Sequence, residues 1–216
     1  MSDRRSARIT CLFLDIGGVL LSDGWNHDAR ALAASCFALD AAEMEQRHAL
    51  VFDGYERDEM TLERYLDLVV FYEDRSFTAA QFRSFMFEQS HPIPGMIELF
   101  TRLKARNRLK VIVVSNEARE LNAHRIRTFA LDRLVDAFVS SCFVHLRKPD
   151  VRIFQLALDV AQTDIAQVLF VDNTAMHLQI AATLGISGIL HTSWHATQSQ
   201  LAAVGLSDDG GHDAVG

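Results

Sequence analysis

The most informative segment of the sequence is Arg8-Ile-Thr-Cys-Leu-Phe-Leu-Asp15-Ile-Gly-Gly-Val-Leu-Leu21. Its apolar run, Cys11–Leu14, predicts a short buried strand that a carboxylate, Asp15, follows at once. Gly17 and Gly18 come next, and glycine lets a backbone turn tightly and approach a ligand closely. In an open α/β sheet, ligands bind at the carboxyl ends of the strands. We therefore predict that Asp15 holds a metal or attacks a phosphoryl group, although a strand that simply ends in a turn would look the same.

The composition is that of a globular protein with enough apolar residues for a full core. The chain has 216 residues, of which 49% are hydrophobic, and its mean hydropathy is +0.07. This length fits one domain, or one domain with a smaller insertion. The net charge is −7 and no long basic run occurs, so we expect neither nucleic acid nor an anionic membrane as a partner. No apolar run approaches the roughly 20 residues of a membrane span.

Two features of the sequence bear on localisation. The first eight residues are polar and lead directly into the expected strand, which is unlike a signal peptide. The cysteines, Cys11, Cys36 and Cys142, are odd in number and widely spaced, as expected for reduced thiols. We therefore expect a cytoplasmic protein. The sequence does not indicate its oligomeric state.

Helical patterns fill about seventy residues after the first strand. Residues that favour helix N-termini precede four apolar stripes at helical spacing: Asn26 or Asp28, Asp40, Thr61 and Thr78. Since no strand pattern interrupts them, residues 22–94 are expected to form a helical cap domain. The segments Ser22–Gly24 and His91–Gly95 would connect this cap to the core and act as hinges.

Strands and helices alternate from residue 95 onward. We expect strands at residues 110–114, 137–140, 168–171 and 188–190, separated by helices at 117–128, 150–160 and 175–184. This alternation predicts an α/β fold, in which residues 1–21 and 95–205 form a Rossmann-like parallel sheet core. Residues around Ser193 and Trp194 are interpreted as a loop. Residues 206–216 are polar and rich in glycine, and we expect them to be a disordered tail.

Polar residues stand at the ends of the later strands, as Asp15 does at the end of the first. They are Ser115 and Asn116, Lys148 in a loop before a helix, and Asp172 and Asn173. Two converging carboxylates repel each other unless a cation lies between them, and oxygen ligands favour Mg²⁺. A hydroxyl and an ammonium group would complete a cradle for a phosphoryl group. Each residue alone fits a helix cap or a solvated loop, but together they predict a phosphate site.

These motifs resemble those of the haloacid dehalogenase-like hydrolases, which are mostly phosphatases that act through an aspartyl phosphate. The resemblance covers about residues 8–192. It rests on four segments in order: Phe13-Leu-Asp15-Ile-Gly-Gly-Val-Leu20, Val113-Val-Ser115-Asn116, Arg147-Lys148-Pro149-Asp150 and Leu169-Phe-Val-Asp172-Asn173. Within the family, the sequence is most similar to sugar-phosphate phosphatases of the alpha-glucose-1-phosphatase type. Those proteins have a small helical cap after the first strand.

The resemblance implies a role for each motif residue. Asp15 would be the nucleophile. Ser115 and Lys148 would hold the phosphate oxygens, and Lys148 would also restrain the carboxylate of Asp15. The implied cofactor is Mg²⁺, bound by Asp15, the backbone carbonyl of Gly17, and Asp172.

The expected substrate is a small phosphorylated metabolite held between the core and the cap. The residues expected to bind it are Gly18, Asn116, Glu56 and Arg57. The last two lie in Gly54-Tyr-Glu-Arg57, which we place on the turn between two cap helices.

Two positions depart from the family's pattern. Most members carry a second Asp, the general acid and base, two residues after the nucleophile, where this chain has Gly17. General acid help is worth about 10²–10⁴-fold, so water or a cap residue such as Glu56 would have to replace it. Asn173 stands where a second carboxylate is commoner, which should weaken the binding of Mg²⁺.

Three functions are compatible with these motifs. The leading one is a Mg²⁺-dependent phosphatase for a small, sugar-like phosphomonoester. A 2-haloacid dehalogenase also lacks the second Asp but needs no metal, so Asp172 favours the phosphatase. A binding or regulatory protein that has lost turnover would explain Gly17 and Asn173 together. Hydrolysis of p-nitrophenyl phosphate with and without Mg²⁺, and chloride release from chloroacetate, distinguish the three.

Overall fold

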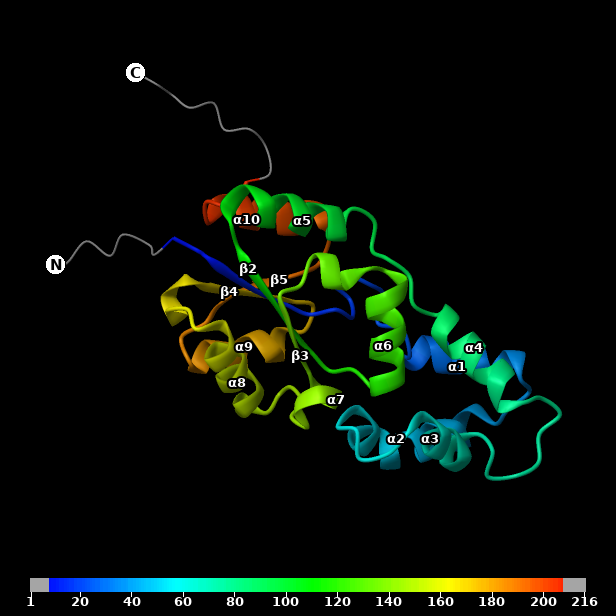
Figure 1. Cartoon of the computed structure of the whole chain (residues 1–216). Coiled ribbons are helices and arrows are strands. Elements are labelled where there is room, and N and C mark those ends of the chain that lie inside the picture. Colours follow the sequence, from blue (N-terminus) through cyan, green and yellow to red (C-terminus); the bar gives the residue numbers. More distant parts are fainter. Residues whose placement is uncertain (1–7, 208–216) are drawn as a thin grey trace, which may run out of the picture.

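A computed structural model describes residues 8–207, and its centre is a five-stranded parallel sheet (Figure 1). The strands are β1 (Cys11–Leu14), β2 (Lys110–Ser115), β3 (Ala137–Ser140), β4 (Val168–Asp172) and β5 (Ser187–Leu190). Their order in the sheet is β3-β2-β1-β4-β5, and every neighbouring pair is parallel. The predicted α/β fold is confirmed. Because the chain leaves β1 for β2 and later returns to β4 on the other side, the sheet has a switch point beside β1, where ligands bind in such folds.

Helices cover both faces of the sheet. Helices α5 (Met96–Asn107) and α10 (Trp194–Ala203) lie on one face, and α8 (Val151–Ala161) and α9 (Ala175–Thr183) on the other (Figure 1). The remaining short elements of the core are α7 (Ser141–Val144), η1 (Leu131–Arg133) and η2 (Ile165–Gln167). Side chains of β1 alternate between the faces: Leu12 and Leu14 pack with α5, and Cys11 and Phe13 pack with α8. Burial on both faces explains why the strands are apolar throughout.

Four helices between β1 and β2 have a hydrophobic cluster of their own. They are α1 (His27–Cys36), α2 (Ala41–Glu56), α3 (Leu62–Val69) and α4 (Ala79–Glu88). Their N-caps are Asn26, Asp40, Thr61 and Thr78, and each accepts a hydrogen bond from a backbone N–H. Phe82 lies fully buried in this cluster and contacts five other aromatic rings. The cluster also includes Leu121 of α6 (Arg119–Thr128), so these helices pack against the core at α6 (Figure 1).

The end of the described chain differs from the sequence-based prediction. The segment around Ser193 and Trp194 is not a loop: Ser193 caps α10 by accepting a hydrogen bond from the Ala196 N–H at 3.2 Å. Leu201 of this helix is fully buried against the sheet, and Leu206, which we assigned to the tail, is only 3% exposed. Residues 208–216 of the predicted tail lie outside the described residues. Helix α10 was missed because it contributes few large apolar side chains, so its periodicity is weak.

Among residues 8–207, no helix combines the length and the apolar composition needed to cross a lipid bilayer.

Candidate active site

The register of the sheet brings Asp15 and Asp172 side by side. Leu14 pairs with Val171 in the ladder between β1 and β4, and each aspartate lies one residue further along its strand. The Asp15 N–H donates to the Val171 carbonyl at 3.0 Å, so the ladder continues up to this residue. Both carboxylates are buried, and Asp172 is entirely shielded from solvent. Two negative charges therefore meet at the switch point of the sheet.

Lys148 lies between the two carboxylates. Its Nζ is 2.8 Å from Asp15 Oδ2 and 2.7 Å from Asp172 Oδ2, and the side chain is 1% exposed. The Asn116 amide holds the Lys148 backbone from both sides, since its Nδ2 donates to the Lys148 carbonyl at 2.9 Å and its Oδ1 accepts from the Lys148 N–H at 2.7 Å. We expected Asn116 to bind substrate. The amide is engaged with the Lys148 backbone, and Asn116 also lines the cavity described below, so its role in binding substrate stays a prediction.

The protonation of this site follows from burial and from its neighbours. Burial raises the pKa of Asp15 to about 6, against the lowering effect of Lys148 and of a hydrogen bond from Ser115. Burial alone would also raise the pKa of Asp172, but hydrogen bonds from His177 and Lys148 outweigh it and bring this pKa to about 2. Both carboxylates are thus ionised at neutral pH, which is the form of Asp15 that can act as a nucleophile.

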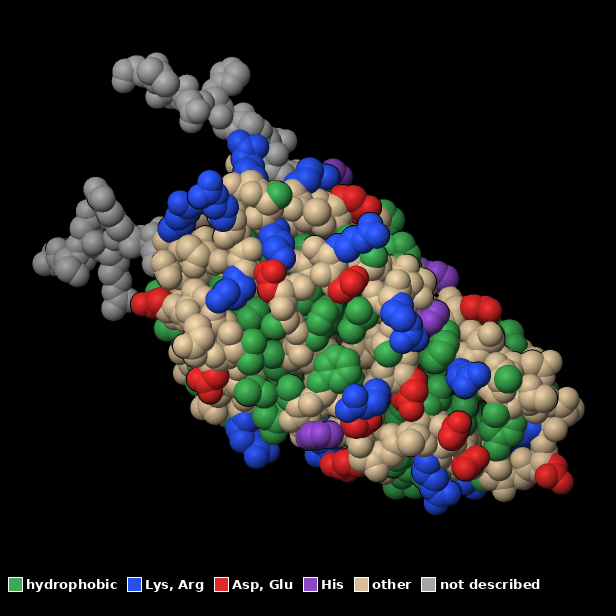
Figure 2. Space-filling model, viewed as in Figure 1, with side chains coloured by type: hydrophobic (Ala, Val, Ile, Leu, Met, Phe, Trp, Pro, Cys, Tyr) green, Lys and Arg blue, Asp and Glu red, His purple; other side chains and the backbone are tan. Residues whose placement is uncertain are grey.

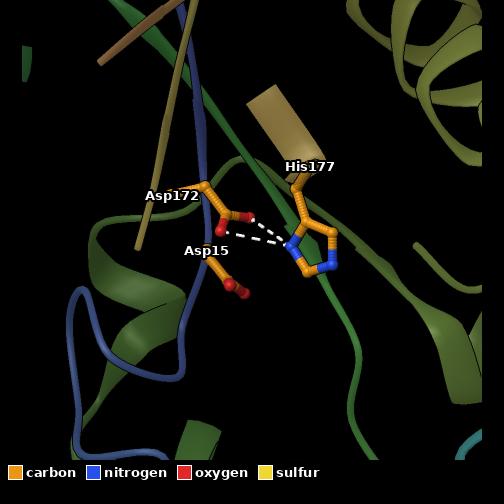
Figure 3. Close-up of side chains that lie close together, drawn as sticks. All are labelled: Asp15, Asp172 and His177. Carbon is orange, nitrogen blue, oxygen red and sulfur yellow. Dashed lines mark hydrogen bonds and ion pairs between the residues drawn. The ribbon is translucent and has the colours of Figure 1, made fainter. Parts of the chain in front are cut away.

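His177 of α9 is a site residue that sequence analysis missed. Its Nδ1 lies 3.1 Å and 3.2 Å from the two Asp172 oxygens (Figure 3). One ligand atom from each of Asp15, Asp172 and His177 lies within 4.8 Å of the others. Carboxylate oxygens are the donors that Mg²⁺ prefers, and imidazole suits transition metals. This set of donors fits a divalent cation.

The two glycines after Asp15 differ in their surroundings. Gly18 has φ +67°, and a Cβ built on it would lie 1.8 Å from Asn173 Nδ2. Its N–H donates to the Leu21 carbonyl at 2.7 Å. Gly18 therefore closes the turn with its N–H, and its role in binding substrate stays a prediction. Gly17 has no positive φ, and it lines the cavity described below.

A buried ion pair lies behind the site. Arg125 Nη1 of α6 is 2.5 Å from Glu117 Oε1, and both side chains are 2% exposed. The same guanidinium donates from Nη2 to the Ser22 carbonyl and from Nε to Ser90 Oγ, both at 3.0 Å. Ser115 is buried beside this pair, with its Oγ 3.4 Å from Glu117 Oε1. Arg125 thus links the core to both segments that enter and leave the cap helices.

A cavity of about 440 Å³ opens between the strand ends and the cap helices. Its core side includes Asp15, Gly17, Asn116, Glu117, Lys148, Asn173 and His177. Asp23, in the segment that connects β1 to the cap helices, also lines it, and the cap side includes Trp25, Arg30, His48, Phe52, Tyr55, Glu56 and Met86. Arg57 is not among the lining residues and instead pairs with Glu59 at 3.1 Å. We expected Arg57 to face the substrate, but it lies just after the last residue of α2 and outside the lining of this cavity.

Glu56 is a buried carboxyl on the cap side. It is 7% exposed, and Arg147 contacts its Oε2 through Nε and Nη2, both at 2.7 Å. Burial raises the pKa of Glu56 to about 7, although Arg147 opposes this shift. The raised value means that folding favours the protonated form.

Glu56 should therefore make the protein less stable as the pH rises. The Glu56 carboxyl binds its proton more tightly in the folded state than in the unfolded state. The protonated carboxyl therefore stabilises the fold below pH 4.5, and this stabilisation is lost as the pH rises to about 7. We expect the free energy of unfolding of the wild type, relative to Glu56→Gln, to fall by about 3 kcal/mol between pH 4.5 and 8. Urea unfolding at both pH values measures it. The exposed Glu59→Gln is the control, and equal slopes in wild type and Glu56→Gln would contradict the assignment.

A family model for haloacid dehalogenase-like hydrolases matches residues 9–185 of this chain. The chain belongs to this family. Mouse acyl-CoA dehydrogenase family member 10 is a relative in sequence, 32% identical over 97 residues. These residues are 44% of this chain, and the chain spans only 9% of the length of the mouse protein.

Solved structures of the haloacid dehalogenase-like family share the fold. An enzyme of the family from Bacteroides thetaiotaomicron, in complex with magnesium and inorganic phosphate, superposes with a TM-score of 0.72 at 19% identity, over 86% of this chain and 96% of its own. A predicted hydrolase of the family from Porphyromonas gingivalis gives 0.72 at 16% identity, over 91% and 98%. The L-2-haloacid dehalogenase of Xanthobacter autotrophicus gives 0.61 at 16% identity, over 92% and 84%.

The family motifs do not include several residues that shape this hydrolase site. Glu117 stands two residues after Ser115, and His177 lies five residues after Asp172, about one turn into the following helix. Their proximity to the motif residues was the only sequence signal available. Arg125 had none, because its partners Ser22 and Ser90 are far away in the sequence.

Proposed function

We propose that this protein is a Mg²⁺-dependent phosphatase, which hydrolyses a small phosphomonoester through an aspartyl phosphate on Asp15. One observation carries the proposal. A buried Lys148 lies 2.8 Å and 2.7 Å from two carboxylates, where the sheet opens into a cavity beside the cap helices. A nucleophile kept ionised by a fixed ammonium group, with a second carboxylate beside it, suits the transfer of a phosphoryl group better than simple ligand binding.

The chain's own groups would divide the chemistry as follows. The Asp15 carboxylate attacks phosphorus, and Lys148 keeps that carboxylate ionised and contacts the phosphoryl oxygens. Ser115 donates a hydrogen bond from its place beside Asp15. Mg²⁺ would be held by Asp15, the Gly17 carbonyl and Asp172, and when bound it would neutralise charge on the phosphoryl oxygens.

The cavity lining favours a leaving group with an apolar face. Trp25, Phe52, Tyr55 and Met86 line the cap side of a cavity of about 440 Å³, which is the size of a compact metabolite site. The sugar-like substrate implied by the resemblance is thus one member of a wider class. Initial rates on alkyl, aryl and sugar phosphates distinguish these leaving groups.

A 2-haloacid dehalogenase is the second candidate. The dehalogenase of Xanthobacter autotrophicus shares the fold, and Lys148 already neutralises part of the charge that a metal would otherwise balance. The enzyme from Bacteroides thetaiotaomicron that was crystallised with magnesium and phosphate supports the phosphatase. The test is hydrolysis of p-nitrophenyl phosphate with and without Mg²⁺, beside chloride release from chloroacetate. Metal-dependent hydrolysis is the expected result, and chloride release alone would favour the dehalogenase. Neither reaction would indicate a binding protein.

Replacing Asp172 by asparagine should weaken the binding of Mg²⁺ by at least about 10-fold. The variant loses a charged oxygen ligand, but an amide oxygen can still accept the Thr174 N–H bond, which is 2.7 Å long in the wild type. Titration calorimetry with MgCl₂ measures the affinity without substrate. The control is Asp159→Asn, on the exposed side of α8. Unchanged affinity in Asp172→Asn would remove this residue from the metal site.

The surface charges and the cysteines indicate what kind of partner to expect and where the protein is located. On the face seen in Figure 2, basic and acidic side chains are interspersed over both the sheet core and the cap helices. This mixture and the net charge of −7 support a small phosphorylated metabolite as the partner, in place of nucleic acid. We propose a cytoplasmic location, which the three free cysteines support.

A further inference from the structure

The turn after β1 leaves room for a side chain at Gly17, and a carboxylate from another segment lies beside that room. Gly17 has no positive φ, so its backbone conformation is open to other residues. A Cβ built on Gly17 would make only ordinary contacts, and the nearest atom would be Oδ1 of Asp23 at 3.5 Å. The space that an acidic side chain at position 17 would enter is therefore next to the Asp23 carboxylate.

Asp23 belongs to the candidate active site. It lines the same cavity as Asp15 and Lys148. Its Oδ1 accepts a hydrogen bond of 3.3 Å from Nδ2 of Asn173, the residue after Asp172. The side chain is also exposed to solvent, so it can exchange protons with water between catalytic steps. These are the positions and the access that a proton-transferring group needs.

The backbone on both sides of Asp23 is anchored. The Ser22 carbonyl accepts a 3.0 Å hydrogen bond from Arg125 Nη2. Gly24 packs so closely on the same guanidinium that a Cβ would lie 1.9 Å from Nη2. Arg125 is in turn fixed by its buried ion pair with Glu117. Asp23 thus sits on a segment that a buried network holds in place at the cavity that Asp15 also lines.

We propose that Asp23 is the general acid and base of the reaction that begins on Asp15, an inference that rests on the proposed phosphatase function. In the first step, the Asp15 carboxylate forms a bond to phosphorus while the bond from phosphorus to the leaving oxygen breaks. The Asp23 carboxyl gives its proton to that oxygen, and the alcohol departs. In the second step, the Asp23 carboxylate takes a proton from water as the water oxygen bonds to phosphorus. The bond from phosphorus to Asp15 breaks, and phosphate is released.

Glu56, which we named with water as a replacement for the missing acid, is less suited to this role. Arg147 holds its Oε2 through two nitrogens at 2.7 Å. It also comes from the end of α2, on the cap side of the cavity, whereas Asp23 adjoins the turn that carries the nucleophile.

The experiment compares kcat/KM for two kinds of substrate in three proteins: wild type, Asp23→Asn, and Gly17→Asp with Asp23→Asn. Alkyl phosphates have leaving oxygens that need a proton, whereas p-nitrophenyl phosphate has one that needs little help. We expect Asp23→Asn to lower kcat/KM for β-glycerophosphate by about 100-fold and for p-nitrophenyl phosphate by less than about threefold. In the double variant, the new carboxyl at position 17 enters the space next to the substituted side chain at position 23 and restores most of the loss. Thermal unfolding confirms that all variants are folded.

The control is Asp28→Asn, an identical change in the first turn of α1 at a residue that does not line the cavity. It should leave both substrates unaffected. Equal losses on the two substrates in Asp23→Asn, no loss, or no recovery in the double variant would each overturn the role of Asp23. A wild-type protein that hydrolyses neither phosphate with Mg²⁺ would instead overturn the phosphatase function itself.

Discussion

Asparagine in place of Asp15 is expected to lower kcat for p-nitrophenyl phosphate by about 10⁴-fold or more. An amide oxygen is a poor nucleophile, so the aspartyl phosphate cannot form. The substitution keeps the size of the side chain and an oxygen for the Ile16 N–H, which donates to Asp15 Oδ1 at 2.9 Å in the wild type. The loss should therefore be one of chemistry and not of folding.

Two measurements separate this expectation from a general loss of activity. Acid quenching during turnover of a ³²P-labelled substrate should trap labelled wild-type protein, and hydroxylamine should release the label, as it does from acyl phosphates. Asp15→Asn should trap none. Asp67→Asn, on the exposed side of α3, is the control for an aspartate outside the cavity. Labelling of Asp15→Asn at the wild-type level would show that another residue is the nucleophile.

Methionine in place of Lys148 should lower the free energy of unfolding by about 3–5 kcal/mol. The substitution leaves Asp15 and Asp172 buried without the ammonium group that contacts both. For a protein of this size, the midpoint of thermal unfolding should fall by about 6–20 °C. Because protonation would neutralise the unpaired carboxylates, the loss should be smaller at pH 5 than at pH 8. Millimolar Mg²⁺ should restore part of the stability by supplying another cation.

The matched control is Lys104→Met. Lys104 also pairs with a carboxylate, Asp136 at 2.6 Å, but this pair lies near the surface, so its loss should cost about 1 kcal/mol or less. Thermal scans of both variants at the two pH values, with and without Mg²⁺, provide the comparison. If Lys148→Met is as stable as the wild type at pH 8, the ion pairs of Lys148 with Asp15 and Asp172 do not stabilise the fold as described above.

Local sequence patterns predicted most of the secondary structure, because the periods of apolar residues differ between helices and strands. The strand Ala137–Ser140 has the predicted bounds, and Thr61 and Thr78 cap helices as expected. Helix α2 runs to Glu56, so Gly54, Tyr55 and Glu56 form its last turn and do not lie on the turn between two cap helices, where we placed them; Arg147, from outside the helix, contacts Glu56. The prediction failed at α10, whose sequence has little apolar periodicity and whose burial comes from the sheet.

The meeting of Asp15 and Asp172 was also predictable. A polar residue that ends a buried strand of a parallel sheet must emerge at one edge, together with the residues that end the neighbouring strands. Asp15 and Asp172 meet because β1 and β4 are adjacent and in register.

The parallel sheet, the inserted helices and the charged residues at the strand ends could thus be predicted from the sequence, since these depend on local periodicity and strand order. The packing of the folded chain sets which side chains share the cavity. It engages Asn116 with the Lys148 backbone, leaves Arg57 outside the lining of the cavity, and brings Asp23 next to the empty space at Gly17. These contacts depend on the packing of segments that are distant in the chain. A local sequence pattern does not determine which distant segment a side chain contacts.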